Sequence, residues 1–304
     1  MISARDVARV AVVAVLASAV VLNSTVRVSA DILYVSNSAS NTIERFTPDG
    51  VHSTFASTGL SGPRGLAFDS VGNLYVANTG SNTIMRFTPD GVGSVFATTG
   101  LNAPWPLAFD SEGNLYAGNI YGWTIMKFAP DGAGTVFASS SNLGEVSALA
   151  FDHAGNLYAA SYLAGEPGHG VEKFSPLGVD LGVFANPSAW PTALAFDNVG
   201  DLYVASTFRS LNYITRFTPD GVGSVFTTTG LDRPFGLAFD SEGNLYAANL
   251  GDHTIERFTP GGVNSTFAST GLDGPIGIAM QIPEPATLAL LALGGLVVLR
   301  RRAR

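Results

Sequence analysis

The stretch Gly65–Asn78 reads GLAFDSVGNLYVAN and is the clearest copy of a unit that recurs along this chain of 304 residues. The segments Thr83–Gly91, TIMRFTPDG, and Ser94–Ala97, SVFA, complete that copy. The Asp of the LAFD element recurs at positions 69, 110, 152, 197 and 240, so the repeat is about 43 residues long. A period of roughly 40–50 residues made of short strands is typical of a β-propeller blade.

Each copy predicts four strands joined by tight turns. The runs GLAF, LYVAN, TIMRF and SVFA are rich in β-branched and aromatic residues, which favour strands. In the turn Asp69–Asn73 the Asp can accept backbone N–H groups, and Gly72 can supply a positive φ. In Thr88–Gly91 the Pro presets φ at the second turn position. No segment of the repeats has a helical period, so we predict an all-β fold.

The two ends of the repeat array complete one blade together. The first copy starts in mid-unit at Asp31–Asn37, which matches a second strand. The last copy stops after Gly277–Met280, which matches a first strand. This closure makes a ring without free sheet edges. Six LYxx elements and six first strands therefore predict a six-bladed β-propeller over residues 31–281, with most Phe and Tyr in its core.

The repeats resemble NHL repeats and the gluconolactonase-like six-bladed propellers across residues 31–281. GLAFDSEGNLYAAN at Gly236–Asn249 and TIMRFTPDG at Thr83–Gly91 carry the resemblance. Lactonase members of that group bind a divalent metal at the channel mouth through Glu, Asn and Asp side chains. The matching positions in this chain cannot form that set, since they are Arg64, Trp105, Ser147, Thr192, Phe235 and Ile276. The resemblance thus predicts architecture better than activity, because one fold hosts many functions.

Residues 1–30 are predicted to be a secretory signal peptide. Two Arg precede the apolar run Val10–Leu22, and Val28–Ala30 is a small-residue cleavage site. Cleavage there would leave Asp31 at the new N-terminus, just ahead of the first strand. The alternatives are a cut after Ala19 and an uncleaved membrane anchor, although the apolar run is shorter than the roughly 20 residues that a span needs.

Residues 282–304 resemble the PEP-CTERM protein-sorting signal. Pro283, Glu284 and Pro285 are followed by an apolar stretch of fourteen residues, 286–299, and then by a cluster of Arg. A helix of that length reaches about 21 Å, less than the roughly 30 Å of the hydrocarbon core. It could hold the protein transiently in the membrane with its Arg cluster in the cytoplasm. A plain tail anchor is the alternative.

This resemblance implies a cellular context. It implies sorting by an exosortase, in a Gram-negative bacterium that makes extracellular polysaccharide. The protein would be exported, anchored transiently in the membrane through its C-terminal segment, and then placed at the cell surface or outside the cell.

Composition restricts the chemistry and the partners. The chain has no Cys, which excludes disulfides and thiolate catalysis. Without the two terminal segments the ring has nine basic and 22 acidic residues, a formal charge of −13. That charge argues against nucleic acid and anionic membranes as partners. The turn carboxylates could attract calcium, but turn capping explains them more simply, so we expect no cofactor.

One face of the ring carries the candidate ligand-binding residues. In a propeller the loops that enter the first strands share a face with the loops between second and third strands. The candidates on these loops are Arg64, Trp105, Trp123, Trp190, Arg233 and Phe235. A shallow face with aromatic rings and few charges suits stacking on sugar rings. The alternative is that the aromatic side chains only plug the channel mouth.

No catalytic residue and no metal site is predicted. His169 with Glu166 is the best acid/base pair, and its alternative interpretation is two solvated loop residues. Glu145 is the carboxylate best placed to reach the mouth, but one carboxylate makes a poor metal site. No His pair has metal-ligand spacing, and no Ser-His-Asp set is indicated.

We therefore favour a non-enzymatic, exported propeller that acts as a surface or matrix interaction module. Its expected partners are the exosortase machinery and either extracellular polysaccharide or surface proteins. The alternative is a metal-dependent lactonase- or lyase-like enzyme, which carboxylates converging on the channel would favour.

Overall fold

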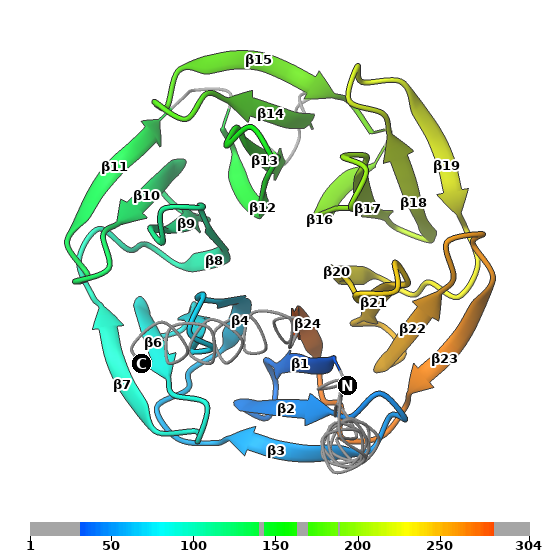
Figure 1. Cartoon of the computed structure of the whole chain (residues 1–304), viewed down its shortest axis with the longest axis horizontal. Helices are drawn as coiled ribbons and strands as arrows, with labels where there is room; N and C mark the ends of the chain where they lie inside the picture. Colours follow the sequence, from blue (N-terminus) through cyan, green and yellow to red (C-terminus); the bar gives the residue numbers. More distant parts are fainter. Residues whose placement is uncertain (1–30, 140–142, 163–169, 188, 283–304) are drawn as a thin grey trace, which may run out of the picture. The chain divides into compact units, whose positions relative to one another are not determined.

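Six four-stranded antiparallel sheets surround a central axis, which confirms the predicted six-bladed β-propeller (Figure 1). The structure is a computed structural model, and it describes residues 31–139, 143–162, 170–187 and 189–282. All 24 described strands belong to the unit Asp31–Ile282. All six sheets of the ring therefore lie within this one unit.

In blades 2 to 4 the strands follow chain order outward from the axis. Blade 2 is β4 (Pro63–Phe68), β5 (Leu74–Asn78), β6 (Thr83–Phe87) and β7 (Gly93–Ala97). Blade 3 is β8 (Pro104–Phe109), β9 (Leu115–Asn119), β10 (Thr124–Phe128) and β11 (Gly134–Ser139). Blade 4 is β12 (Glu145–Phe151), β13 (Leu157–Tyr162), β14 (Gly170–Phe174) and β15 (Asp180–Ala185).

Blades 5 and 6 keep this order, and blade 1 is assembled from both ends. Blade 5 is β16 (Trp190–Phe196), β17 (Leu202–Phe208), β18 (Leu211–Phe217) and β19 (Gly223–Thr227). Blade 6 is β20 (Pro234–Phe239), β21 (Leu245–Asn249), β22 (Thr254–Phe258) and β23 (Asn264–Ala268). Blade 1 is β24 (Pro275–Gln281), β1 (Ile32–Asn37), β2 (Thr42–Phe46) and β3 (His52–Ala56).

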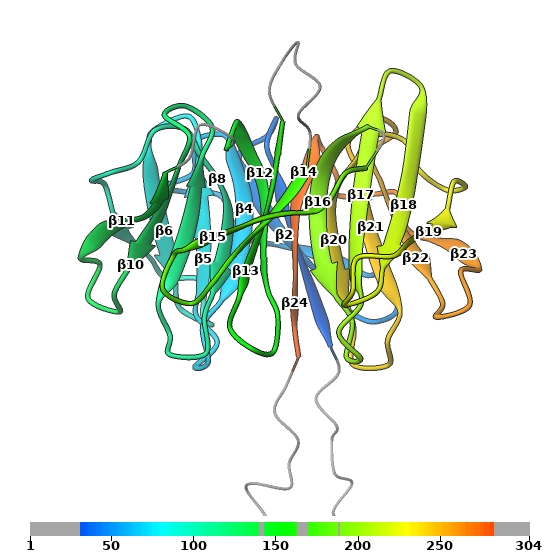
Figure 2. The same ribbon diagram turned by 90° about the horizontal axis from the view of Figure 1, so that it is seen from above.

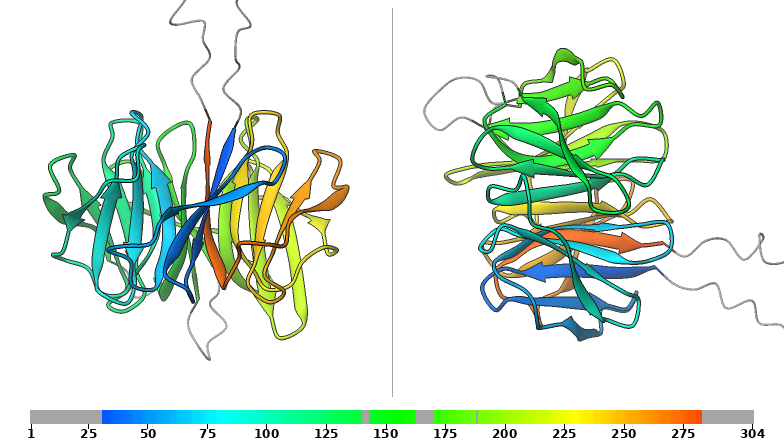
Figure 3. Two further views of the ribbon diagram at one scale, coloured as in Figure 1. Left: turned by 90° about the horizontal axis from the view of Figure 1, so that it is seen from below. Right: turned by 90° about the vertical axis from the view of Figure 1, so that its left-hand side faces the viewer.

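Blade 1 closes the ring as the sequence predicts. β24 pairs antiparallel with β1, with Leu33 opposite Met280 and Ile32 opposite Gln281. Figure 3 shows these two strands side by side, one orange and one blue, although they come from opposite ends of the chain. The start of β1 and the end of β24 therefore lie at the same face of the ring (Figure 2).

The blades pack on one another through a repeated aromatic cluster. Tyr75 of β5 lies edge-on against Phe96 and Phe109 of blades 2 and 3, with centroid distances of 4.9 and 5.0 Å. The second-strand Tyr of each blade is buried in this way. Each such pair adds about 0.5–1.5 kcal/mol beyond the burial of its area. The prediction that these aromatic residues form the core is confirmed.

The repeated Asp caps its own turn, also as predicted. The Oδ1 atom of Asp69 accepts hydrogen bonds from the backbone N–H groups of Val71 at 3.1 Å and Asn73 at 2.8 Å. Gly72 closes the turn with a φ of +87°, a conformation that favours glycine. These carboxylates thus have local hydrogen-bond donors.

The predicted signal peptide and the C-terminal hydrophobic helix lie outside the described residues. Within the described ranges, no helix is both long enough and apolar enough to cross a membrane.

Candidate functional site

One face of the ring, which we call the site face, is formed by two sets of connections. They are the loops that lead into the innermost strands and the connections between second and third strands. In Figure 2 it is the upper side, where the hairpin of β17 and β18 rises. The start of β1 and the end of β24 lie at the opposite face. The first and last described strand ends of the chain therefore lie at the face that does not carry the candidate residues.

The repeat presents two rings of six equivalent positions to the site face. The inner ring lies two residues before the Leu of each LAFD element and consists of Arg64, Trp105, Ser147, Thr192, Phe235 and Ile276. The outer ring lies two residues earlier still and consists of Gly62, Ala103, Glu145, Trp190, Arg233 and Gly274. The large side chains of the outer ring thus fall on the adjacent blades 4, 5 and 6.

A cavity of about 270 Å³ opens where these rings meet. Its lining includes five of the six predicted residues, namely Arg64, Trp105, Trp190, Arg233 and Phe235. Trp123 is not among the lining residues; it lies in the connection between β9 and β10 and is 46% exposed. The cavity adjoins a narrow central channel of about 70 Å³, with which it shares Trp105 and Phe235.

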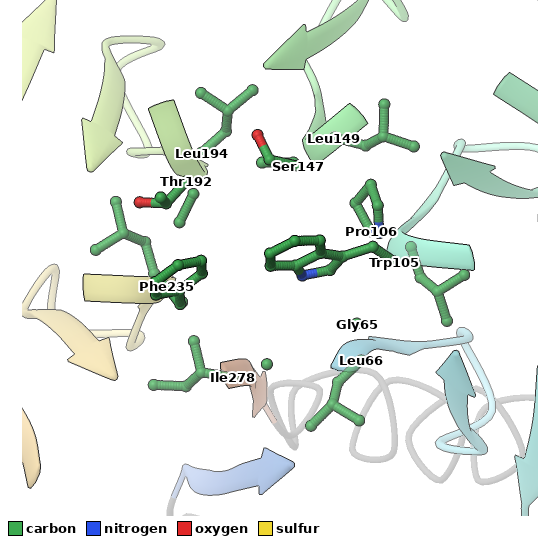
Figure 4. Close-up of a pocket in the computed structure, with 16 residues that line it drawn as sticks. Gly65, Leu66, Trp105, Pro106, Ser147, Leu149, Thr192, Leu194, Phe235 and Ile278 are labelled. Carbon is green, nitrogen blue, oxygen red and sulfur yellow. The ribbon is translucent and has the colours of Figure 1, made fainter. Parts of the chain in front are cut away.

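Trp105 and Phe235 cover the mouth of that channel. Their rings stack with centroids 5.7 Å apart and planes 11° from parallel, and Figure 4 shows both pointing into the centre. Trp105 is only 6% exposed. The guanidinium carbon of Arg64 lies 4.1 Å from the centre of the indole ring. Trp105 is thus packed into the mouth of the channel, the position expected if the aromatic side chains only plug it.

A second aromatic group forms the other wall of the cavity. Tyr162 stacks on Trp190 with centroids 5.4 Å apart and planes 16° from parallel. Phe208 meets the same indole ring edge-on at 5.2 Å. Trp190 is only half-buried. In the sequence, Tyr162 and Phe208 fall in the long connections between second and third strands of the fourth and fifth copies, which predicts that both lie on this face, although neither is among the six candidates. In the structure, β13 and β17 are longer than β5 and carry the two residues at their ends.

Burial changes the acid–base behaviour of two groups at the cavity. Burial raises the pKa of Tyr162 far above its usual value, and a hydrogen bond to the Glu145 carboxylate raises it further. Tyr162 stands opposite Glu145 in the register of β12 and β13. Burial also lowers the pKa of Arg64, while Tyr162, Tyr121 and Glu145 oppose that change. The site thus holds a partly desolvated cation beside a neutral phenol.

The metal that the lactonase resemblance implies does not fit this mouth. Ser147 and Thr192 supply the only hydroxyl groups of the inner ring, and both donate to backbone carbonyls of the next blade. Ser147 bonds the carbonyl of Pro191 at 2.7 Å, and Thr192 bonds that of Pro234 at 2.5 Å. Among the residues that the structure describes, no three His, Asp or Glu side chains gather as a metal site.

The Asn residues at the ends of second strands bond to the backbone of neighbouring loops. Asn78 donates to the carbonyl of Gly59 at 2.8 Å and accepts from the N–H of Ser61 at 3.2 Å. Asn119 makes the matching pair with Gly100 and Asn102. The acid/base candidates Glu166 and His169 lie outside the described residues.

Comparisons with known proteins concern the C-terminal segment and the propeller fold. Residues 281–303 match the family model of the PEP-CTERM protein-sorting motif. That motif marks exported proteins that exosortase processes and sorts to the cell surface. Among curated proteins, no sequence matches this chain significantly.

Several solved structures share the propeller. Virginiamycin B lyase from Staphylococcus aureus superposes with a TM-score of 0.62 at 18% identity, over 82% of this chain and 84% of that one. A gluconolactonase from Xanthomonas campestris gives 0.59 at 17% identity, over 82% of each chain. A streptogramin B lyase gives 0.61 at 16% identity, over 81% of this chain and 91% of its own. At such identities the likeness shows the fold alone.

Proposed function

We propose that this protein is an exported binding module whose site-face cavity holds a sugar ring of an extracellular polysaccharide. The observation that supports it most is the aromatic wall, in which Trp190 is half-buried and flanked by Tyr162 and Phe208. A pyranose ring presents a face of C–H bonds that carries slight positive charge. The negative face of an indole attracts such a surface while covering apolar area.

The sorting motif begins at residue 281, where β24 ends. The proposal includes export from a Gram-negative bacterium, transient anchoring through the C-terminal segment, and then a place at the cell surface or outside the cell, where the cavity would meet its ligand.

The residues around the cavity suit binding better than turnover. Its described lining contains no carboxylate and no imidazole, and its hydroxyl-bearing Thr192 is engaged by backbone. The alternative, a lactonase- or lyase-like enzyme, would need a general acid or base that reaches the ligand. Glu145 is the nearest such group, and its partner is Tyr162.

The experiment is a titration of the propeller unit 31–282 with a glycan panel and with the polysaccharide of the host. The full chain in detergent micelles is titrated beside it. We expect saturable binding that Trp190→Ala abolishes and that Trp123→Ala retains, because Trp123 is an exposed indole outside the cavity. Absence of saturable binding, or release of a modified product on incubation, would instead favour a protein partner or the enzyme.

A further inference from the structure

Three of the nine basic side chains of the propeller stand outside the repeat. Six occupy one repeated position, the fourth residue of the TIMRF element, and are Arg45, Arg86, Lys127, Lys173, Arg216 and Arg257. The other three are Arg64, Arg209 and Arg233, and all three lie in the loops and strand ends of the site face. In a ring of formal charge −13, every unrepeated cation is thus on the face with the cavity.

Four of the six repeated cations have a carboxylate partner among the described residues; for example, Lys127 pairs with the turn residue Asp110 at 3.4 Å, and Arg257 pairs with Glu242 at 3.5 Å. The other two repeated cations, Arg45 and Arg86, have no such ion pair, and Arg45 donates to the hydroxyl of Ser53 at 3.0 Å.

Likewise, no carboxylate of the described chain lies within the 4.0 Å ion-pair distance of Arg64, Arg209 or Arg233. Arg64 is partly buried, whereas Arg209 and Arg233 are exposed. A partly desolvated cation without an anion is costly, so Arg64 in particular would gain from binding an anion.

Each of the three lies against an aromatic ring instead. The guanidinium carbons of Arg64, Arg209 and Arg233 lie 4.1, 5.2 and 6.0 Å from the ring centres of Trp105, Phe208 and Phe235, respectively. Contacts of this kind hold a guanidinium plane in place while leaving its N–H donors at the edge. Arg64 and Arg233 both line the cavity.

Arg233 also occupies a backbone conformation that disfavours it. Its φ is +54°, and the equivalent positions with a positive φ carry Gly62, Gly274 and Ala103, with φ of +54°, +65° and +53°. A residue with a Cβ atom is disfavoured there, and Arg233 is the largest of the four. Unfavourable backbone geometry is concentrated at functional sites, and this loop keeps an arginine where two other blades have glycine.

We propose that the sugar bound in this cavity is acidic, with its carboxylate held by Arg64 and Arg233 while the wall around Trp190 stacks on its ring. This proposal rests on the proposed function above and names the class of ligand, a uronate-containing polysaccharide. A guanidinium matches a carboxylate through two parallel N–H donors. At physiological ionic strength the Debye length is about 8 Å, which screens the acidic turns of the opposite face from the ligand.

The test compares an oligogalacturonate with the same oligomer after its carboxyl groups are reduced to neutral hydroxymethyl groups. Titration calorimetry is run on unit 31–282 and on the full chain at one fixed ionic strength. We expect the acidic oligomer to bind about tenfold tighter or more, the scale of charge-assisted hydrogen bonds. Arg64→Gln and Arg233→Gly should each remove most of that preference.

Two further variants test whether the preference for the acidic oligomer depends on charges at the cavity. Arg257→Gln removes the same charge at a repeated position whose partner lies in a turn of the opposite face, and should leave the preference unchanged. Glu145→Gln removes the carboxylate nearest to Arg64, and should tighten binding of the acidic oligomer several-fold. A variant that unfolds is recognised by its thermal transition, and Arg233→Gly is expected to keep or raise that transition.

Each outcome decides between the two proposals. Equal binding of both oligomers, unaffected by Arg233→Gly, would overturn the acidic-sugar inference and leave carbohydrate binding intact. Binding of neither oligomer by folded protein would overturn both. A preference that Arg257→Gln weakens as much as Arg233→Gly would assign it to overall charge and contradict a local carboxylate site.

Discussion

Glu172 of β14 stands opposite Val183 of β15, and its Oε2 atom has no hydrogen-bond partner among the described residues. The side chain is 4% exposed. In the two other blades with Glu at this position the opposite residue is Thr, which donates to the carboxylate. Where the opposite residue is Val, the other blades carry Met85, Met126 or Thr215. Blade 4 alone therefore combines the acid with the apolar partner.

Glu172→Met should therefore stabilise the protein, because blades 2 and 3 already accommodate this Met–Val pair. The effect should depend on pH. Burial, aided by the charge of Asp180, raises the pKa of Glu172 from 4.5 to about 7. The native state thus favours the protonated acid, and stability is present below pH 4.5 and lost as the pH rises through 7. The gain from Glu172→Met should be larger by about 3 kcal/mol at pH 8 than at pH 4.

Denaturant unfolding at a series of pH values measures this gain. Glu256→Met is the matched control, because the Glu256 carboxylate accepts hydrogen bonds from Thr266 and Asn264. Its loss should cost about 1–2 kcal/mol. The assignment of Glu172 as an uncompensated buried acid would be contradicted if Glu172→Met were less stable than wild type at pH 8. It would also be contradicted if the gain in unfolding free energy did not depend on pH.

Trp123 occupies a left-handed position that other blades fill with better-suited residues. Its φ is +50°, and the equivalents are Asn41, Asn82 and His253, with φ between +54° and +57°. Asn tolerates this conformation, whereas a bulky aromatic residue does not. Trp123→Asn should therefore raise the free energy of unfolding by about 0.5–1 kcal/mol. Denaturant unfolding measures the change, and glycan binding should stay at the wild-type level.

The ring should depend on β24. Truncation after Gly274 removes the partner of β1 together with the buried Ile276 and Ile278. The exposed edge and the lost core contacts should abolish a cooperative thermal transition. Truncation after Ile282 should keep the wild-type transition, because every described strand is retained. If the shorter chain unfolded cooperatively at the same temperature, closure by the two ends would not be needed for stability.

Trp105 should contribute mainly to stability, and Trp190 mainly to ligand binding. Trp105 is almost fully buried and stacked against Phe235, so Trp105→Ala should lower stability by about 3 kcal/mol or more. Trp190 is half-buried, so Trp190→Ala should lower stability less than Trp105→Ala does, and it should weaken ligand binding more. Thermal unfolding and titration of the same preparations separate the two effects. Equal loss of stability in both variants would make Trp190 a packing residue.

The fold could be predicted because the repeat states it several times. A single strand signal is weak, but the same Asp-to-Gly turn and the same apolar runs recur in register, and Asp31–Asn37 and Gly277–Met280 match different strands of one unit. The position of five candidate residues at the mouth could be predicted by the same logic, since counting back from each LAFD element places them there. Trp123 was placed on the same face by its loop between second and third strands, but it does not line the cavity.

The other features of the candidate site depend on departures from the repeat. Tyr162 lines the cavity and Phe208 packs on Trp190, since β13 and β17 continue past the point where β5 ends. The long connections in the sequence place both residues on this face, but periodicity does not show that they contact Trp190. Arg64 and Arg233 have no ion pair with a carboxylate of the described residues, and this depends on distances between blades that no spacing along the chain reveals.

The proposed ligand of the cavity on the site face is a sugar ring. The most direct test of this proposal is calorimetric titration of unit 31–282 with an acidic oligosaccharide, comparing wild type with Trp190→Ala and Trp123→Ala. We expect saturable binding by wild type and Trp123→Ala, and none by Trp190→Ala, whose cooperative thermal transition would show that it is folded. Binding that Trp190→Ala leaves intact, or that no form of the folded protein shows, would contradict the proposal.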